Sequence, residues 1–179
     1  MLSEPLPNTL DVRKAAARGV SIKGTLKPLD LQRLRAVLAD DNGTIEADLT
    51  FSRDEENRYL IHLVTTAEVS VTCQRCLEPM IQTLACENTL AVVWTDEQAG
   101  HLPRYLEPLV VEGDACELWD VVEDELILAL PAFSYHNTVE CKQTLARFNA
   151  AQAPAEESGP AEKPNPFNVL AQLKPGSKT

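Results

Sequence analysis

The feature that most constrains the fold is a long stretch of period-two hydrophobicity in the first half of the chain. Apolar and polar residues alternate over residues 45–51, again over 59–72, and once more over 84–94. This period is that of a strand with one buried face. Because the connections at 54–58 and 73–79 are short, we expect three neighbouring antiparallel strands.

Three other segments have the 3.6-residue period of helices. Residues 11–18 combine an N-capping Asp with good helix formers and are followed by a glycine. Asp30 precedes a second apolar stripe, which ends at the turn-prone residues 40–43. A longer stripe occupies 117–130, with acids in its first turn and Pro131 after its end.

Two shorter segments, at 20–26 and 106–111, are expected to be extended. Together these elements indicate an α+β fold, in which helices pack on an antiparallel sheet that could also curl into a barrel. The chain of 179 residues is 44% apolar, which is enough for one sizeable core. We therefore predict a single α+β domain over residues 1–142.

The composition changes after that domain. Residues 143–162 are mainly Ala, Gln, Glu, Pro, Ser and Gly, with too few large apolar groups to offset the entropy of ordering, so we predict a flexible linker. Residues 163–179 contain an apolar island behind two prolines, which is typical of a docking peptide. Its candidate partner-binding residues are Asn165, Pro166, Phe167, Val169, Leu170 and Leu173.

Charge and hydropathy restrict the partners that we expect. A net charge of −11 disfavours broad binding to a phosphate backbone. No window approaches the roughly 18 apolar residues of a membrane span, and the N-terminal sequence lacks the pattern of a signal peptide, so we expect a cytoplasmic protein that binds no membrane. Seven acids and no Lys or Arg lie within 112–125. We predict that Glu123, Asp124 and Glu125 contact a basic protein partner.

The cysteines are the candidate metal ligands. Five cysteines without an export signal indicate free thiols or metal ligands rather than a disulfide framework. Cys73 and Cys76 stand between two predicted strands, where a hairpin tip could point two thiolates at one ion. His136 and Cys141 would complete a tetrahedral structural zinc site if the end of the long helix lies beside that tip. Cys86 has the parity of a core residue.

Alternatives to this zinc site remain open. The four residues could be unconnected thiols and a loop histidine, with no metal between them. Cys73 and Cys76 could instead form a thiol-based redox or metal-sensing pair, although Pro79 and a strand follow where such a pair normally opens a helix. Arg75, between the two cysteines, is a weak candidate for RNA contact, and a solvated loop charge is the favoured interpretation.

The sequence lacks the motifs of common enzyme classes. It has no glycine-rich phosphate loop and no Gly-x-Ser-x-Gly elbow, while His62 lies on a polar strand face and His101 in a loop. Runs of acids such as that within 112–125 are more often solvated faces than acid/base pairs. We therefore expect a binding protein rather than an enzyme.

Four blocks of sequence together resemble the YceD family. They are Cys73–Cys76, Val122–Pro131, His136–Cys141 and Lys163–Lys174, in this order and spacing. The resemblance extends over nearly the whole chain. It implies a ribosome-biogenesis factor needed for the synthesis, processing or stability of 23S ribosomal RNA, with no established catalytic activity. It also implies contact with the 23S rRNA maturation or transcription machinery, which the charge suggests is made through a basic protein. Some relatives carry additional cysteines after the long helix.

Overall fold

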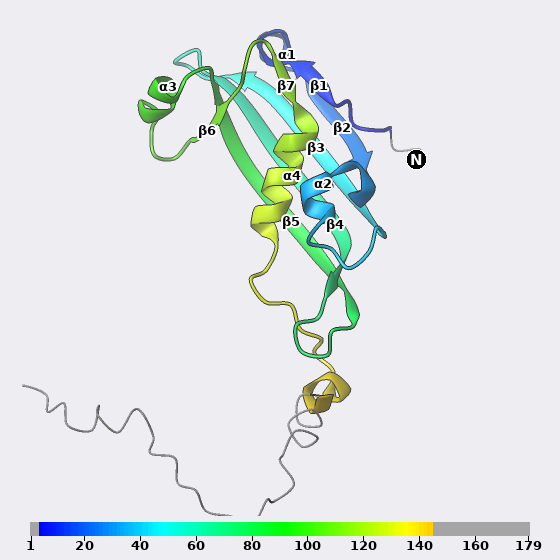
Figure 1. Cartoon of the computed structure of the whole chain (residues 1–179). Coiled ribbons are helices and arrows are strands. Elements are labelled where there is room, and N and C mark those ends of the chain that lie inside the picture. Colours follow the sequence, from blue (N-terminus) through cyan, green and yellow to red (C-terminus); the bar gives the residue numbers. More distant parts are fainter. Residues whose placement is uncertain (1–3, 145–179) are drawn as a thin grey trace, which may run out of the picture. The chain divides into compact units, whose positions relative to one another are not determined.

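The computed structural model describes residues 4–144, which form an open five-stranded sheet with helices on one face (Figure 1). The strand order is β2-β3-β4-β5-β6. The strands are β2 (Ser21–Leu26), β3 (Gly43–Arg53), β4 (Tyr59–Thr72), β5 (Pro79–Val93) and β6 (Glu107–Val110). The predicted α+β class is confirmed. The sheet does not close into a barrel, because β2 and β6 both remain edge strands.

The three long strands follow the predicted alternation. β3, β4 and β5 pair antiparallel, with Leu49 opposite Leu63 and Ala67 opposite Leu84 on the buried face. The same strands expose polar residues such as Glu46 and Glu68 on the other face. The sheet therefore buries one face and leaves the other to water.

Two strand pairings differ from a simple antiparallel meander. β6 pairs with β5 in the parallel direction, because the chain first crosses back through 94–106 before it enters β6. A separate two-stranded ribbon joins β1 (Thr9–Asp11) to β7 (Ala115–Glu117). Each strand of this ribbon has three residues, which is too short to show a period in the sequence.

The apolar face of the sheet is covered by α1 (Val12–Arg18), a 3-10 turn η1 (Pro28–Asp30), α2 (Gln32–Arg35) and α4 (Leu118–Ala129) (Figure 1). The remaining helix, α3 (Asp96–Gly100), lies at the edge of the domain and buries no residue. In α1 the Asp11 carboxylate accepts the Lys14 N–H, and Gly19 closes the helix in the left-handed conformation with φ 62°, as predicted. The long predicted helix is confirmed as α4.

The second predicted helix is shorter than its apolar stripe. Asp30 accepts the Lys27 N–H and closes η1, so it does not cap a long helix. α2 is only four residues long, and Val37 beyond it is 56% exposed. The short helix α3, capped by Thr95, was not predicted.

The core lies between the inner face of the sheet and α4. Leu118, Val122 and Leu126 of α4 are fully buried against strands that contribute Phe51 and Leu63. Each such side chain contributes about 1.5–3 kcal/mol through burial. Among residues 4–144, no helix has both the length and the apolar content needed to cross a bilayer. The predicted docking peptide at 163–179, and the linker predicted for 143–162 except its first two residues, lie outside the described residues.

Candidate metal centre

The connection between β4 and β5 holds the first two candidate ligands, Cys73 and Cys76. The Cys73 N–H donates to the Glu78 carbonyl, and the Leu77 N–H donates back to the Cys73 carbonyl, both at 2.9 Å. Leu77 takes a left-handed conformation with φ 63°, which glycine would adopt more readily. These bonds close a tight loop at the tip of the two strands.

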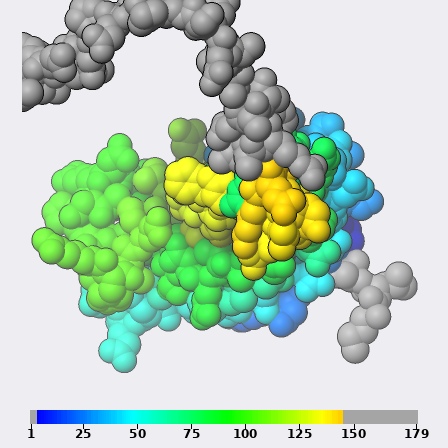
Figure 2. All heavy atoms as spheres, turned by 90° about the horizontal axis from the view of Figure 1, so that it is seen from below, coloured from blue at the N-terminus to red at the C-terminus, as the bar shows by residue number. Residues whose placement is uncertain are grey.

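The segment after α4 brings the other two ligands to this tip. Ser134 is buried, and its carbonyl accepts the Gln74 N–H at 2.9 Å, which ties the segment to the β4–β5 loop. Further on, the Thr138 hydroxyl accepts the Cys141 N–H at 3.3 Å as a helical turn begins. Figure 2 views this end of the domain and shows the gold to orange segment over it.

The four side chains converge on one point. One sulfur or ring nitrogen from each of Cys73, Cys76, His136 and Cys141 lies within 4.8 Å of the others. The Cys73 and Cys141 sulfurs are 3.6 Å apart, and the Cys76 sulfur is 3.2 Å from His136 Nδ1. Ligands around a tetrahedral zinc, with metal bonds of about 2.0–2.3 Å, are separated by similar distances. The arrangement of these four residues could hold a metal ion.

The histidine is oriented by a partner outside this group. Its Nε2 lies 3.2 Å from the Pro79 carbonyl, while its Nδ1 faces Cys76. Since a carbonyl only accepts, Nε2 carries the proton and donates, which leaves the Nδ1 lone pair free. Metal-binding histidines are commonly fixed in this way.

The electrostatics of the cluster favour a cation. Burial alone would raise the pKa of Cys73, but backbone N–H donors from Cys76, His136 and Arg75 outweigh it and lower that pKa to about 5. The pKa of Cys141 is raised by burial and by the neighbouring Cys73 and Cys76 sulfurs. Thiolates this close repel one another, and a divalent cation among them would relieve that repulsion.

Comparison with known proteins identifies the family of this chain. The family model described as large ribosomal RNA subunit accumulation protein YceD matches residues 61–174. A Haemophilus influenzae protein named large ribosomal RNA subunit accumulation protein YceD is 36% identical over 170 residues, covering 94% of this chain and 96% of that protein. This chain belongs to the YceD family. The resemblance predicted from four sequence blocks is thus confirmed, and no solved structure matches the chain.

In this YceD-family domain, two acids predicted to meet a partner are buried. Glu123 is 4% exposed and accepts the backbone N–H groups of Arg33 and Leu34 at 2.6 and 3.0 Å, and the Arg33 Nε–H at 2.8 Å. The same guanidinium bonds Asp124, which is exposed, at 2.5 Å. Arg33 lies 90 positions before Glu123, so no local sequence pattern predicts these hydrogen bonds between α2 and α4. We call this contact of Arg33 and Leu34 with Glu123 the α2–α4 clamp.

Glu125 is the second buried acid. Its carboxylate accepts from the Asn88 amide at 3.0 Å and from the Cys86 thiol at 3.1 Å. Burial and this carboxylate raise the pKa of Cys86 to about 11. Cys86 was expected to be a core residue, and it is instead a half-buried hydrogen-bond donor. Contact of Glu123 and Glu125 with a partner stays a prediction. Both carboxylates already accept hydrogen bonds within the domain.

Arg75 is more than a solvated loop charge. Its guanidinium lies 4.8 Å from the centre of the Tyr135 ring, and one of its nitrogens is 3.9 Å from the Cys141 sulfur. Tyr135 in turn stacks on the exposed Phe133. Arg75 therefore braces the segment that carries two of the ligands. Direct contact of Arg75 with RNA stays a prediction.

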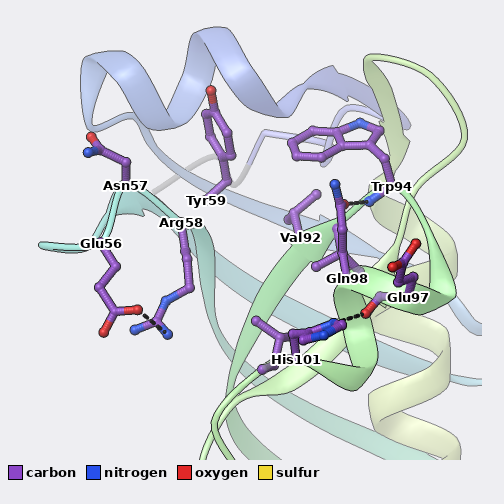
Figure 3. Close-up of a pocket in the computed structure, with 11 residues that line it drawn as sticks. Glu56, Asn57, Arg58, Tyr59, Val92, Trp94, Glu97, Gln98 and His101 are labelled. Carbon is purple, nitrogen blue, oxygen red and sulfur yellow. Dashed lines mark hydrogen bonds and ion pairs between the residues drawn. The ribbon is translucent and has the colours of Figure 1, made fainter.

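A hollow of about 530 Å³ lies towards the other end of β4 (Figure 3). Tyr59 and Trp94 form one wall and meet edge to face, with ring centres 5.4 Å apart. Arg58 on its rim is already paired with Asp54 and Glu56. The hollow thus offers an aromatic wall beside a cation that is neutralised within the chain.

Proposed function

We propose that this chain supports the accumulation of 23S ribosomal RNA by binding other molecules rather than by catalysis. The observation that carries this proposal is its similarity to the Haemophilus influenzae relative, which is 36% identical over 94% of this chain and is named for that role. The match covers 96% of the relative, so the relative named for this role aligns with this chain over nearly its full length. We propose that the protein acts in the cytoplasm, where rRNA is made.

We further propose that Cys73, Cys76, His136 and Cys141 bind one structural zinc ion. Three sulfurs and one imidazole nitrogen are a donor set that suits zinc. Four protein ligands leave no open position for a substrate, which favours a structural role over a catalytic one. When bound, the ion would neutralise the thiolates and hold the β4–β5 loop to the segment that follows α4.

The partner in this proposal is a basic protein of the 23S rRNA maturation or transcription machinery. The net charge of −11 supports a basic partner and disfavours direct binding to RNA over a wide surface. In this scheme a domain over residues 1–142 is followed by a linker at 143–162 and a docking peptide at 163–179. The partner-contact residues of that peptide are Asn165, Pro166, Phe167, Val169, Leu170 and Leu173.

A second candidate is a thiol-based redox or metal-sensing protein that uses the Cys73 and Cys76 thiols, with Cys141 as a further thiol beside Cys73. The low pKa of Cys73, about 5, favours a thiolate, and its sulfur lies 3.6 Å from that of Cys141. An oxidant such as a peroxide could take two electrons and two protons from this pair and leave a disulfide. Complete burial of Cys73 argues against rapid attack by an external oxidant.

Depletion of the protein in growing cells tests the leading proposal. We expect the ratio of 23S to 16S rRNA to fall and a plasmid copy of the chain to restore it. An unchanged ratio after depletion would overturn the proposal. Comparison of the full chain with one truncated after Ala153 tests the docking peptide, since we expect the truncated chain to restore less 23S rRNA and to capture fewer partners.

A double Cys73→Ser, Cys76→Ser variant separates the two candidates. A structural zinc site predicts loss of both zinc and thermal stability in this variant. The redox candidate predicts an intact fold whose response to oxidants is lost. Thermal unfolding and metal analysis of the purified variant distinguish these outcomes.

A further inference from the structure

A groove runs between α4 and β6 on the face of the sheet that carries the helices. Two hollows of about 430 and 270 Å³ make it up, and they share Leu109, Val121 and Asp124 as lining residues. Figure 1 shows α4 crossing this face beside β6, and β6 is an edge strand of the sheet. The groove is therefore open to solvent along the edge of the domain.

The rim of this groove is strongly acidic. Among residues 4–144, no Lys or Arg lines either hollow. The exposed acids along it are Glu107, Glu112, Glu117, Asp120 and Asp124. Within residues 4–144, the carboxylates of Glu112, Glu117 and Asp120 form no ion pair. Their charge is thus not neutralised by this part of the chain.

The negative charge of these acids also raises the pKa of a neighbouring cysteine. Cys116 lines the groove, and burial together with the charges of Glu117 and Asp120 raises its pKa to about 11. A thiolate there is disfavoured by the same acids that would attract a cation. The groove therefore attracts positive charge and repels a phosphate backbone.

The groove also carries apolar side chains that the rest of the domain over residues 4–144 leaves exposed. Leu128 on α4 is 72% exposed and Val110 on β6 is 47% exposed. They lie along the two sides of the groove, while the buried Val121 contributes to its floor. Exposed leucine and valine beside a row of unpaired acids form an amphipathic binding surface.

We propose that this α4–β6 groove binds an extended, basic peptide segment in which Lys or Arg alternates with apolar residues. Side chains of an extended peptide point alternately to opposite sides, so one set could cover Leu128 and Val110 while the other reaches the acids. α4 has 12 residues, which gives a length of about 18 Å, the span of about five or six extended residues. The inference rests on the proposed function, because such a segment would belong to its basic partner.

Fluorescence anisotropy with the full chain and a labelled peptide tests this proposal. The probe is a short peptide that alternates Arg with Leu or Val. The groove variant is Glu112→Gln, Glu117→Gln, Asp120→Asn. Its matched control, Glu46→Gln, Glu55→Gln, Glu68→Gln, removes the same charge from exposed acids elsewhere.

We expect the groove variant to weaken peptide binding about tenfold, from the combined loss of three exposed charge pairs, and the control variant to weaken it far less. A Leu128→Ser variant tests the apolar side independently. Because Leu128 is 72% exposed, this change leaves the core intact, and we expect peptide binding to weaken severalfold.

Equal loss of binding in the groove and control variants would overturn the proposal, because the peptide would then sense only net charge. Tighter binding of a single-stranded RNA oligonucleotide than of the peptide would also overturn it. The 23S rRNA ratio in depleted cells is a separate readout. If peptide binding follows the groove but the ratio does not change on depletion, the groove stands and the proposed function fails.

Discussion

We predict from the α2–α4 clamp between Arg33 and Glu123 how much a Glu123→Ala change lowers the free energy of unfolding. In a Glu123→Ala variant, the backbone N–H groups of Arg33 and Leu34 lose the acceptor that lies 2.6 and 3.0 Å away in a buried site. Leaving two such donors unsatisfied costs about 1–3 kcal/mol each, so the free energy of unfolding should fall by about 2–6 kcal/mol. For a domain of about 140 residues this lowers the midpoint of thermal unfolding by roughly 7–20 °C.

Thermal and urea unfolding followed by circular dichroism measure this loss. Asp124→Ala is the matched control, because Asp124 bonds the same guanidinium but is 56% exposed on its side chain, and its loss should cost less than about 1 kcal/mol. Glu123→Gln keeps one acceptor oxygen and should fall between the two. Equal destabilisation by Glu123→Ala and Asp124→Ala would refute the reasoning that burial of the Glu123 carboxylate decides its contribution.

Three further predictions concern other parts of the domain. Asp11→Ala removes the cap of α1 and should cost about 1 kcal/mol in urea unfolding, whereas Asp11→Ser should cost less. Cys86, whose pKa is raised to about 11, should react slowly with iodoacetamide at neutral pH, and Glu125→Gln should speed that reaction; an unchanged rate would contradict the role given to the carboxylate. Hydrogen bonds from Arg58 outweigh burial and lower the pKa of Asp54, so its stabilising contribution is present above its ordinary pKa and is lost as the pH falls through the lowered value. Asp54→Asn should therefore flatten the acid limb of the stability curve, and a limb of unchanged slope would exclude that contribution.

The long strands and α4 could be predicted because their burial is periodic. Over residues 45–94 one face of each strand is apolar, and that face is the buried one in the structure. Other features had no local signal. β1 and β7 are three residues each and are joined across the chain, and α2 ends early although its apolar stripe continues to Val37 and Leu38. Pairing between segments distant in the sequence forms the β1–β7 ribbon.

The four ligand residues of the candidate metal centre could be predicted from the sequence, but the hydrogen bonds that orient them could not. Cysteine and histidine spacing pointed to Cys73, Cys76, His136 and Cys141, and the structure brings all four together. The Pro79 carbonyl that orients the histidine has no signature, because backbone groups are present at every position. The burial of Glu123 likewise has no local signature, because its partner Arg33 lies 90 positions away in the sequence.

The metal content of the purified full chain tests the central claim most directly. Native mass spectrometry and elemental analysis should find one zinc ion per wild-type chain. We expect the Cys73→Ser, Cys76→Ser variant to lose that zinc, and the Cys86→Ser variant, which changes a cysteine outside the cluster, to keep it. Wild-type protein without zinc, or zinc retained in the double variant, would contradict the assignment of these four residues as a structural zinc site.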